Sequence, residues 1–120
     1  MARNASKRIL IVDNHADAAD SLAVLLRAMG HRVFVARHAS IALEIARDVS
    51  PQLVLLHLAM PEMSGYELAK RMREQLGEEV KLCALTGNGL ERDPKRAVEA
   101  GLDRHLLKPA DPDTLRDLLA

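Results

Sequence analysis

A single histidine interrupts the most apolar stretch of the chain. The run Leu53–Pro61 is rich in Leu and Val, carries His57 at its centre and ends at a proline. A run this short is typical of a strand buried on both faces, and it places His57 at or near the carboxyl end of that strand. Open α/β sheets bind their ligands at this edge. An imidazole there can fill the edge by packing, accept a phosphoryl group or bind a transition metal.

Other polar side chains follow the remaining apolar runs. Asp13, Asn14 and His15 come directly after residues 8–12. The loop Thr86, Gly87 and Asn88 follows residues 80–85, and Lys108 with Pro109 follows residues 104–107. If these runs are parallel strands of one sheet, the side chains that follow them meet at the same edge as His57.

The segments between the apolar runs have the spacing of amphipathic helices. Strands are expected over residues 8–12, 31–36, 53–57, 80–85 and 104–107, and helices from about residues 17, 40, 64, 94 and 112. Gly30 is expected to end the first helix, and Ser64 with Glu67 has the pattern of a capping box. Strands that alternate with helices through short connections form a parallel sheet with right-handed crossovers. The sequence therefore predicts one doubly wound α/β domain over residues 1–120.

The composition argues against several classes of partner. The 17 basic and 17 acidic residues cancel, which removes the electrostatic argument for binding nucleic acid or an anionic membrane. Phe34 and Tyr66 are the only aromatic residues, too few for a base-stacking platform. Cys83 is the only cysteine and is expected to be a buried apolar residue. No signal peptide or membrane-spanning run is evident, so a cytoplasmic, reducing compartment is expected.

Several short motifs together resemble the receiver domains of two-component signalling, particularly those of hybrid sensor kinases. They are the segments Arg8–Asp13, Met60–Pro61, Gly65–Leu68, Ala84–Gly87 and Lys108–Pro109. The resemblance covers Arg8 to Leu119 and implies a flavodoxin-like (βα)5 sheet with strand order 2-1-3-4-5. It also implies a switch in which an aspartate on the third strand accepts a phosphoryl group from a phosphohistidine. An acidic pair holds magnesium, and a lysine and a hydroxyl hold the product.

The chain departs from this pattern at two positions. His57 stands at the phosphoacceptor position, and Asn14 stands at the second position of the acidic pair. Asp13, Thr86 and Lys108 match the family, and His105 stands where an aromatic switch residue is common. An imidazole cannot form an acyl phosphate, and magnesium prefers charged oxygen ligands. We therefore expect no aspartyl phosphotransfer, no enzymatic activity, no cofactor and weak or lost magnesium binding.

Each residue of the altered edge has an expected structural role. His57 is expected to be a neutral imidazole that fills the pocket and hydrogen-bonds Thr86 or a backbone carbonyl. Lys108 is expected to form an ion pair with Asp13. Thr86 is expected to be a fixed strand-end hydroxyl, and His105 a surface or half-buried residue. Two alternatives stay open: a phosphohistidine at His57, or a transition metal held by Asp13, His15 and His57, although their spacing does not enforce that geometry.

The resulting hypothesis is a degenerate receiver domain that works as a phosphorylation-independent interaction module. Its partner would be a sensor kinase or an output domain. The surface that binds this partner would lie within the segment from Arg92 to Leu119. A monomer or weak homodimer is expected, without nucleic acid or membrane. The alternatives are a phosphorelay receiver phosphorylated at a non-aspartyl site such as His57, and a small-molecule or metal sensor that uses the edge of the sheet.

Overall fold

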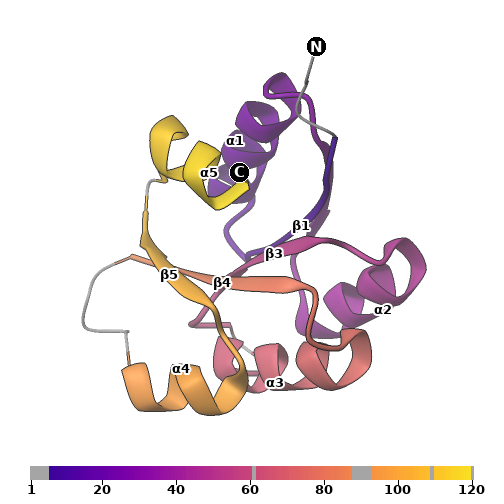
Figure 1. Ribbon diagram of the computed structural model, residues 1–120, viewed down its shortest axis with the longest axis vertical. Helices are drawn as coiled ribbons and strands as arrows, with labels where there is room; N and C mark the ends of the chain where they lie inside the picture. Colours follow the sequence, from indigo (N-terminus) through magenta and orange to yellow (C-terminus); the bar gives the residue numbers. More distant parts are fainter. Residues whose placement is uncertain (1–5, 61, 88–92, 109, 120) are drawn as a thin grey trace.

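Five parallel strands form one sheet in the order β2-β1-β3-β4-β5. The computed structural model describes residues 6–60, 62–87, 93–108 and 110–119. The strands are β1 (Arg8–Val12), β2 (Arg32–Ala36), β3 (Leu53–His57), β4 (Lys81–Thr86) and β5 (Arg104–Leu107). The helices are α1 (Ala16–Ala28), α2 (Ala39–Val49), α3 (Gly65–Leu76), α4 (Pro94–Ala100) and α5 (Pro112–Leu119). The predicted doubly wound α/β fold and its strand order are confirmed (Figure 1).

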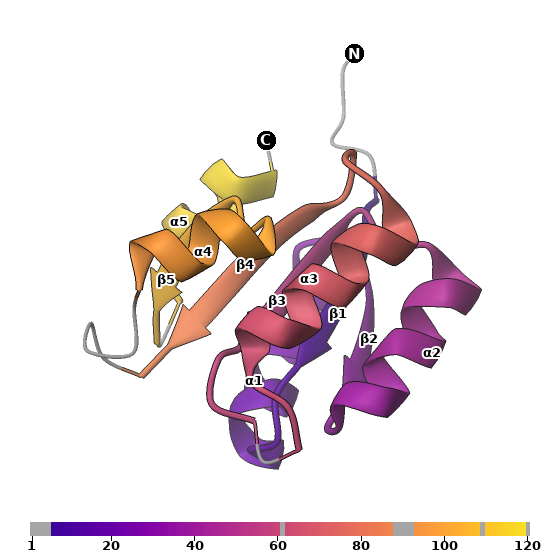
Figure 2. The same ribbon diagram turned by 90° about the horizontal axis from the view of Figure 1, so that it is seen from below.

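The helices cover both faces of the sheet. Helices α1 and α5 lie on one face, and α2, α3 and α4 lie on the other (Figures 1 and 2). Successive residues of β3 pack alternately into the two layers: Leu53 and Leu55 contact the α1 and α5 side, while Val54 and Leu56 contact the other side. All five residues of β3 are buried. Burial on both faces explains why its sequence is continuously apolar.

The local signals in the sequence act as expected at most element ends. Ser64 Oγ accepts a hydrogen bond from the backbone N–H of Glu67 at 3.2 Å, and this caps α3. The carboxylate of Glu67 accepts from Nε of Arg71 at 3.1 Å, so the structure shows the serine half of the capping box. Gly30 follows α1 with φ of 97°, a backbone conformation that favours glycine.

Strand β4 extends one residue further than the apolar run predicts. Thr86 pairs with Leu107 of β5, and its carbonyl accepts a hydrogen bond from the backbone N–H of Lys108 at 2.8 Å. Thr86 is therefore a strand residue and not the first residue of the loop. Pairing with β5, which the local sequence does not reveal, supplies the additional backbone bond.

Some predicted loop positions lie outside the described residues. They are Pro61, Asn88, Gly89, Arg92 and Pro109. In the described part of the chain, every helix is too short or too polar to cross a membrane.

Candidate functional site

Asp13, His57 and Thr86 are buried although their side chains are polar, with exposed fractions of 1%, 5% and 1%. The sheet register explains why they meet. Val12, the last residue of β1, pairs with Leu56 of β3, so Asp13, directly after β1, lies beside His57, the last residue of β3. His57 in turn pairs with Leu85 of β4, and Thr86 follows it. The predicted convergence of these three residues at the carboxyl edge is confirmed.

Lys108 joins this edge from the far end of the chain. Its Nζ donates to Oδ2 of Asp13 at 2.5 Å. The Asp13 side chain is 2% exposed and that of Lys108 is 21% exposed, so the charge of the lysine is only partly in contact with water. The contact ties the end of β1 to the end of β5, and it is the pairing that the sequence predicts.

The other oxygen of Asp13 is held by the loop that begins α1. Oδ1 accepts from the backbone N–H of His15 at 3.0 Å and lies 3.2 Å from Nδ1 of its ring. Burial alone would raise the pKa of Asp13 and is the largest single influence. The hydrogen bonds from Lys108 and His15 and the positive charge of Lys108 together outweigh it, so the pKa lies below its ordinary value. Asp13 is therefore a buried carboxylate that stays ionised at neutral pH.

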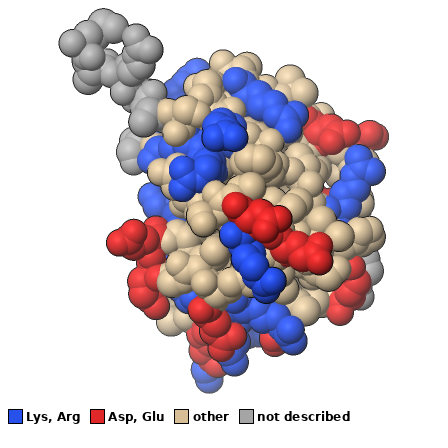
Figure 3. Space-filling model, turned by 90° about the vertical axis from the view of Figure 1, so that its right-hand side faces the viewer, with Lys and Arg blue, Asp and Glu red and all other residues tan. Residues whose placement is uncertain are grey.

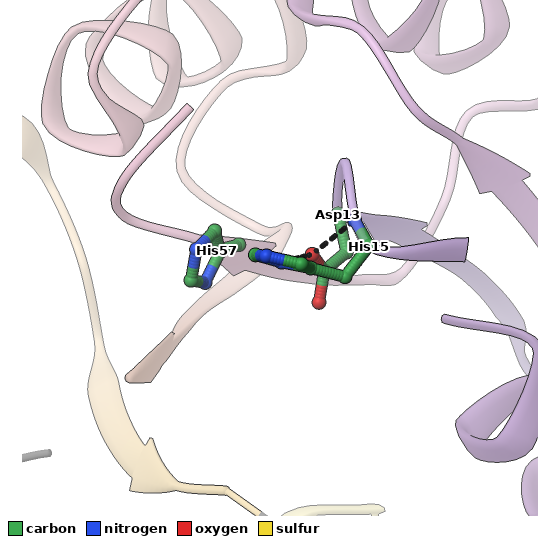
Figure 4. A group of neighbouring side chains, drawn as sticks. All are labelled: Asp13, His15 and His57. Carbon is green, nitrogen blue, oxygen red and sulfur yellow. Dashed lines mark hydrogen bonds and ion pairs between the residues drawn. The ribbon is translucent and has the colours of Figure 1, made fainter. Parts of the chain in front are cut away.

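His15 and His57 approach each other across the same edge. Their ring centroids are 5.3 Å apart and the rings are nearly perpendicular, at 82°. Figure 4 shows both rings beside the Asp13 carboxylate, with the edge of the His15 ring turned toward His57. One possible ligand atom from each of Asp13, His15 and His57 lies within 4.8 Å of the other two. Two imidazoles and one carboxylate therefore lie close together at this edge of the sheet.

The two remaining candidates from the sequence are Asn14 and His105. Asn14 is half-buried, and its Oδ1 is buried without a hydrogen-bond partner among the described residues. His105 is half-buried on β5, in register with Ala84 of β4, which agrees with the expected surface or half-buried position. His105 does not belong to the cluster of His, Cys, Asp and Glu ligands that the described residues form.

A cavity that the sequence did not predict lies beside the Asp13–Lys108 ion pair. It has a volume of about 520 Å³ and is lined on one side by Asp17, Ser21 and Leu25 of α1. Asp17, Ser21 and Leu25 are spaced four residues apart and therefore share a face of the helix. This regular spacing is the signal in the sequence that could have indicated the cavity, because the apolar positions of α1 alone predict only a face packed on the core.

A family model described as the response regulator receiver domain matches residues 9–120. The chain belongs to this family. The domain is therefore a receiver of two-component signalling, as the motifs predicted, and it has the fold of chemotaxis-type receivers.

Individual relatives agree with this assignment. An uncharacterized 14.6 kDa protein from the sodA1 3′ region of Leptolyngbya boryana is 40% identical over 105 residues, which are 87% of this chain and 80% of that protein. The sensor histidine kinase RcsC of Salmonella typhimurium is 34% identical over 117 residues, 98% of this chain but 12% of the kinase. A receiver domain structure from Methylobacillus flagellatus has a TM-score of 0.86 at 28% identity and covers 96% of this chain and 97% of that one. Transcriptional regulators among the relatives are about twice as long as the matched segment.

Proposed function

We propose that this receiver domain signals through protein contacts without being phosphorylated on an aspartate. The observation that carries the proposal is the end of β3, where the buried side chain is the imidazole of His57. A receiver needs a carboxylate nucleophile to form an acyl phosphate, and an imidazole cannot form one. Among the described residues Asp13 is the one buried carboxylate. We therefore place His57 at the phosphoacceptor position and Asn14 at the second position of the acidic pair.

The state of Asp13 supports this proposal. Both of its oxygens are already engaged, Oδ2 by the Lys108 ammonium and Oδ1 by His15. A phosphodonor would have to displace the lysine from a buried contact before it reached the carboxylate. Displacing one partner of a buried charge pair is costly because the other charge is left unpaired.

The donors at the edge also argue against the magnesium ion that the family uses. Magnesium prefers oxygen ligands in a nearly octahedral arrangement. The described edge offers one buried carboxylate that already binds a cation, together with two imidazoles. These residues do not fit a magnesium site, and we propose that magnesium binding is weak or lost and that the domain is not an enzyme.

Without a phosphoryl group, the switch residues have nothing to move toward. We propose that Thr86 stays fixed as the last residue of β4 and that the position of His105 does not depend on phosphorylation. In the absence of a bound ion, the Lys108–Asp13 pair links β5 to β1 in this scheme. The surface formed by α4, β5 and α5 would then keep a single conformation. Binding of a partner to it would be controlled by the abundance of the partner or by competition.

The surface formed by α4, β5 and α5 is the proposed contact region. Val98 on α4 and Leu107 on β5 are exposed large apolar side chains within this region, at 78% and 61%. We propose a sensor kinase or an output domain as the partner, a monomer or weak homodimer as the free form, and a cytoplasmic location. Figure 3 shows basic and acidic side chains interspersed on one face, which supports a partner other than nucleic acid.

The proposal is tested by incubating the protein with acetyl phosphate and magnesium and measuring its intact mass. We expect no phosphoryl adduct on the parent protein, because the end of β3 carries an imidazole in place of a carboxylate. A receiver of known activity serves as the control for the donor. The variant H57D with N14D restores two carboxylates and is expected to take up phosphate. A stoichiometric adduct on the parent would overturn the proposal, and mapping it to His57 would favour a phosphohistidine relay.

A further inference from the structure

We propose that Asp13, His15 and His57 form a binding site for a divalent transition metal, with zinc as the most suitable ion. The three side chains come from two strand ends, at positions 13, 15 and 57, and the fold brings a ligand atom of each within 4.8 Å of the other two. Two imidazoles and a carboxylate are a donor set that zinc, copper and nickel prefer over magnesium. A three-residue site of this kind leaves a fourth position for water or another ligand.

The three ligand atoms, which lie within 4.8 Å of one another, would have to move closer together to hold an ion. In a tetrahedral site with bonds of about 2.1 Å, the ligand atoms lie about 3.4 Å apart. Nδ1 of His15 is already 3.2 Å from Oδ1 of Asp13. The His15 side chain is 63% exposed, so its ring can rotate toward the ion without disturbing the core. Asp13 and His57 are buried and supply the fixed side of the site.

A second histidine–carboxylate pair shows what the proposed site has in addition. Nδ1 of His38 lies 3.2 Å from Oε2 of Glu62, the same distance as in the His15–Asp13 pair. Both side chains of the His38 pair are exposed, at 62% and 42%, and no third ligand joins them among the described residues. The buried His57 is therefore the feature that distinguishes the proposed site from an ordinary surface contact.

One other charged side chain, that of Lys108, affects metal binding at this edge. Lys108 occupies Oδ2 of Asp13, and its positive charge competes with an incoming cation. Since its side chain is 21% exposed, it can turn to solvent when the ion binds. Cys83 does not compete as a ligand, because its thiol is fully buried and burial raises its pKa to about 12. Metal binding would thus replace the lysine–aspartate contact that joins β1 to β5.

This inference does not depend on the absence of phosphorylation. Metal binding and phosphoryl uptake are measured separately, so either proposal can fail while the other stands. Phosphate uptake by the parent would overturn the proposed function without removing the cluster of ligands. A failure to bind zinc would leave the proposed function unchanged.

The experiment is a calorimetric titration of the tag-free, chelator-treated chain with zinc chloride and, separately, with magnesium chloride. We expect saturable binding of one zinc ion and at least 10-fold weaker binding of magnesium. His15→Ala and His57→Gln should each weaken zinc binding roughly 10-fold or more. His38→Ala is the matched control and should leave the affinity unchanged. Lys108→Met should strengthen zinc binding, since it removes the competing cation.

The titrations distinguish a specific site at Asp13, His15 and His57 from nonspecific binding of zinc to surface histidines. Absence of saturable zinc binding would overturn the proposal, as would zinc affinity that is the same in the parent, His15→Ala and His57→Gln. An equal loss in His38→Ala would show that zinc binds scattered histidines. If the buried position does not tolerate His57→Gln, circular dichroism will show the loss of fold, and the exposed His15→Ala still decides the question.

Discussion

The two ends of the sheet use their charged side chains in different ways. At the carboxyl end, Asp13 and Lys108 bind each other and are largely buried. At the amino end, Arg8 and Arg73 donate mainly to backbone carbonyls, and Arg73 also pairs with Asp103. Arg8 reaches the carbonyls of Val49 and Ser50 at 2.9–3.0 Å. Arg73 reaches those of Gly77, Val80 and Gly101 at 2.6–2.9 Å.

This difference separates a scaffold from a site that can change. A carbonyl is a permanent acceptor, so the arginines at the amino end fix the loops before β3, β4 and β5 under all conditions. The lysine and the aspartate at the carboxyl end depend on each other, and a ligand that takes one of them releases the other. The carboxyl end is therefore the part of the molecule that can respond to a bound ion or a chemical change.

The largest effect on stability is expected when the buried pair loses its lysine. Lys108→Met leaves the Asp13 carboxylate buried without its main partner, which should lower the free energy of unfolding by about 3 kcal/mol. The matched change at the amino end is Lys81→Met. Lys81 is exposed and its Nζ lies 3.4 Å from the carbonyl of Leu118, so that variant should lose less than about 0.5 kcal/mol. Urea unfolding at pH 7 measures both.

If Lys108→Met and Lys81→Met lose the same free energy of unfolding, the proposed difference between the two ends of the sheet is wrong. An additional Asp13→Asn change in the Lys108→Met background sharpens the test. It removes the stranded charge and should recover part of the lost stability. No recovery would mean that the lysine stabilises the fold through packing of its stem and not through the ion pair.

A smaller effect is expected from the main arginine of the amino end. Arg73→Met removes three hydrogen bonds to carbonyls and an ion pair with Asp103 at 3.0 Å. We expect a loss of about 2 kcal/mol in the free energy of unfolding, because the arginine is 14% exposed and its bonds are charge-assisted. Zinc affinity should not change, since the arginine lies at the other end of the sheet. A change in zinc affinity would show that the two ends are coupled.

The sequence was sufficient for the fold and for part of the site. Helical spacing and the buried run of β3 predict the elements, and parallel strands bring Asp13, His57 and Thr86 together whatever the details of the loops. The contact between Lys108 and Asp13 could also be predicted, because each needs a partner of opposite charge at a buried edge. These features depend on topology and on the cost of burying a charge.

Other features depend on loop conformation and could not be predicted. The approach of His15 to His57 follows from the turn before α1 and from a ring orientation that spacing does not determine. The Arg73 network was missed because an arginine on an amphipathic helix normally faces solvent. Its carbonyl acceptors include Gly101, 28 residues away, and no sequence pattern marks an acceptor of this kind.

The smallest effect expected concerns the response of the amino end to pH. His31 lies before β2, and its Nδ1 accepts a hydrogen bond from the backbone N–H of Lys7 at 3.1 Å. Partial burial, followed by the charge of Lys7, lowers the pKa of His31 below its ordinary value of 6.5.

The unfolded chain therefore binds a proton at His31 more readily than the folded chain does. Stability should be unaffected by this group above pH 6.5, fall as the pH drops below 6.5, and level off once the pH is below the folded pKa. His31→Gln keeps an acceptor but does not titrate, so the parent should lose more stability than this variant between pH 8 and pH 5. Urea unfolding at the two pH values measures the difference. If the parent and the variant lose the same free energy of unfolding between pH 8 and pH 5, the pH response does not come from His31. The amino end would then be insensitive to pH, as its hydrogen bonds to backbone carbonyls suggest.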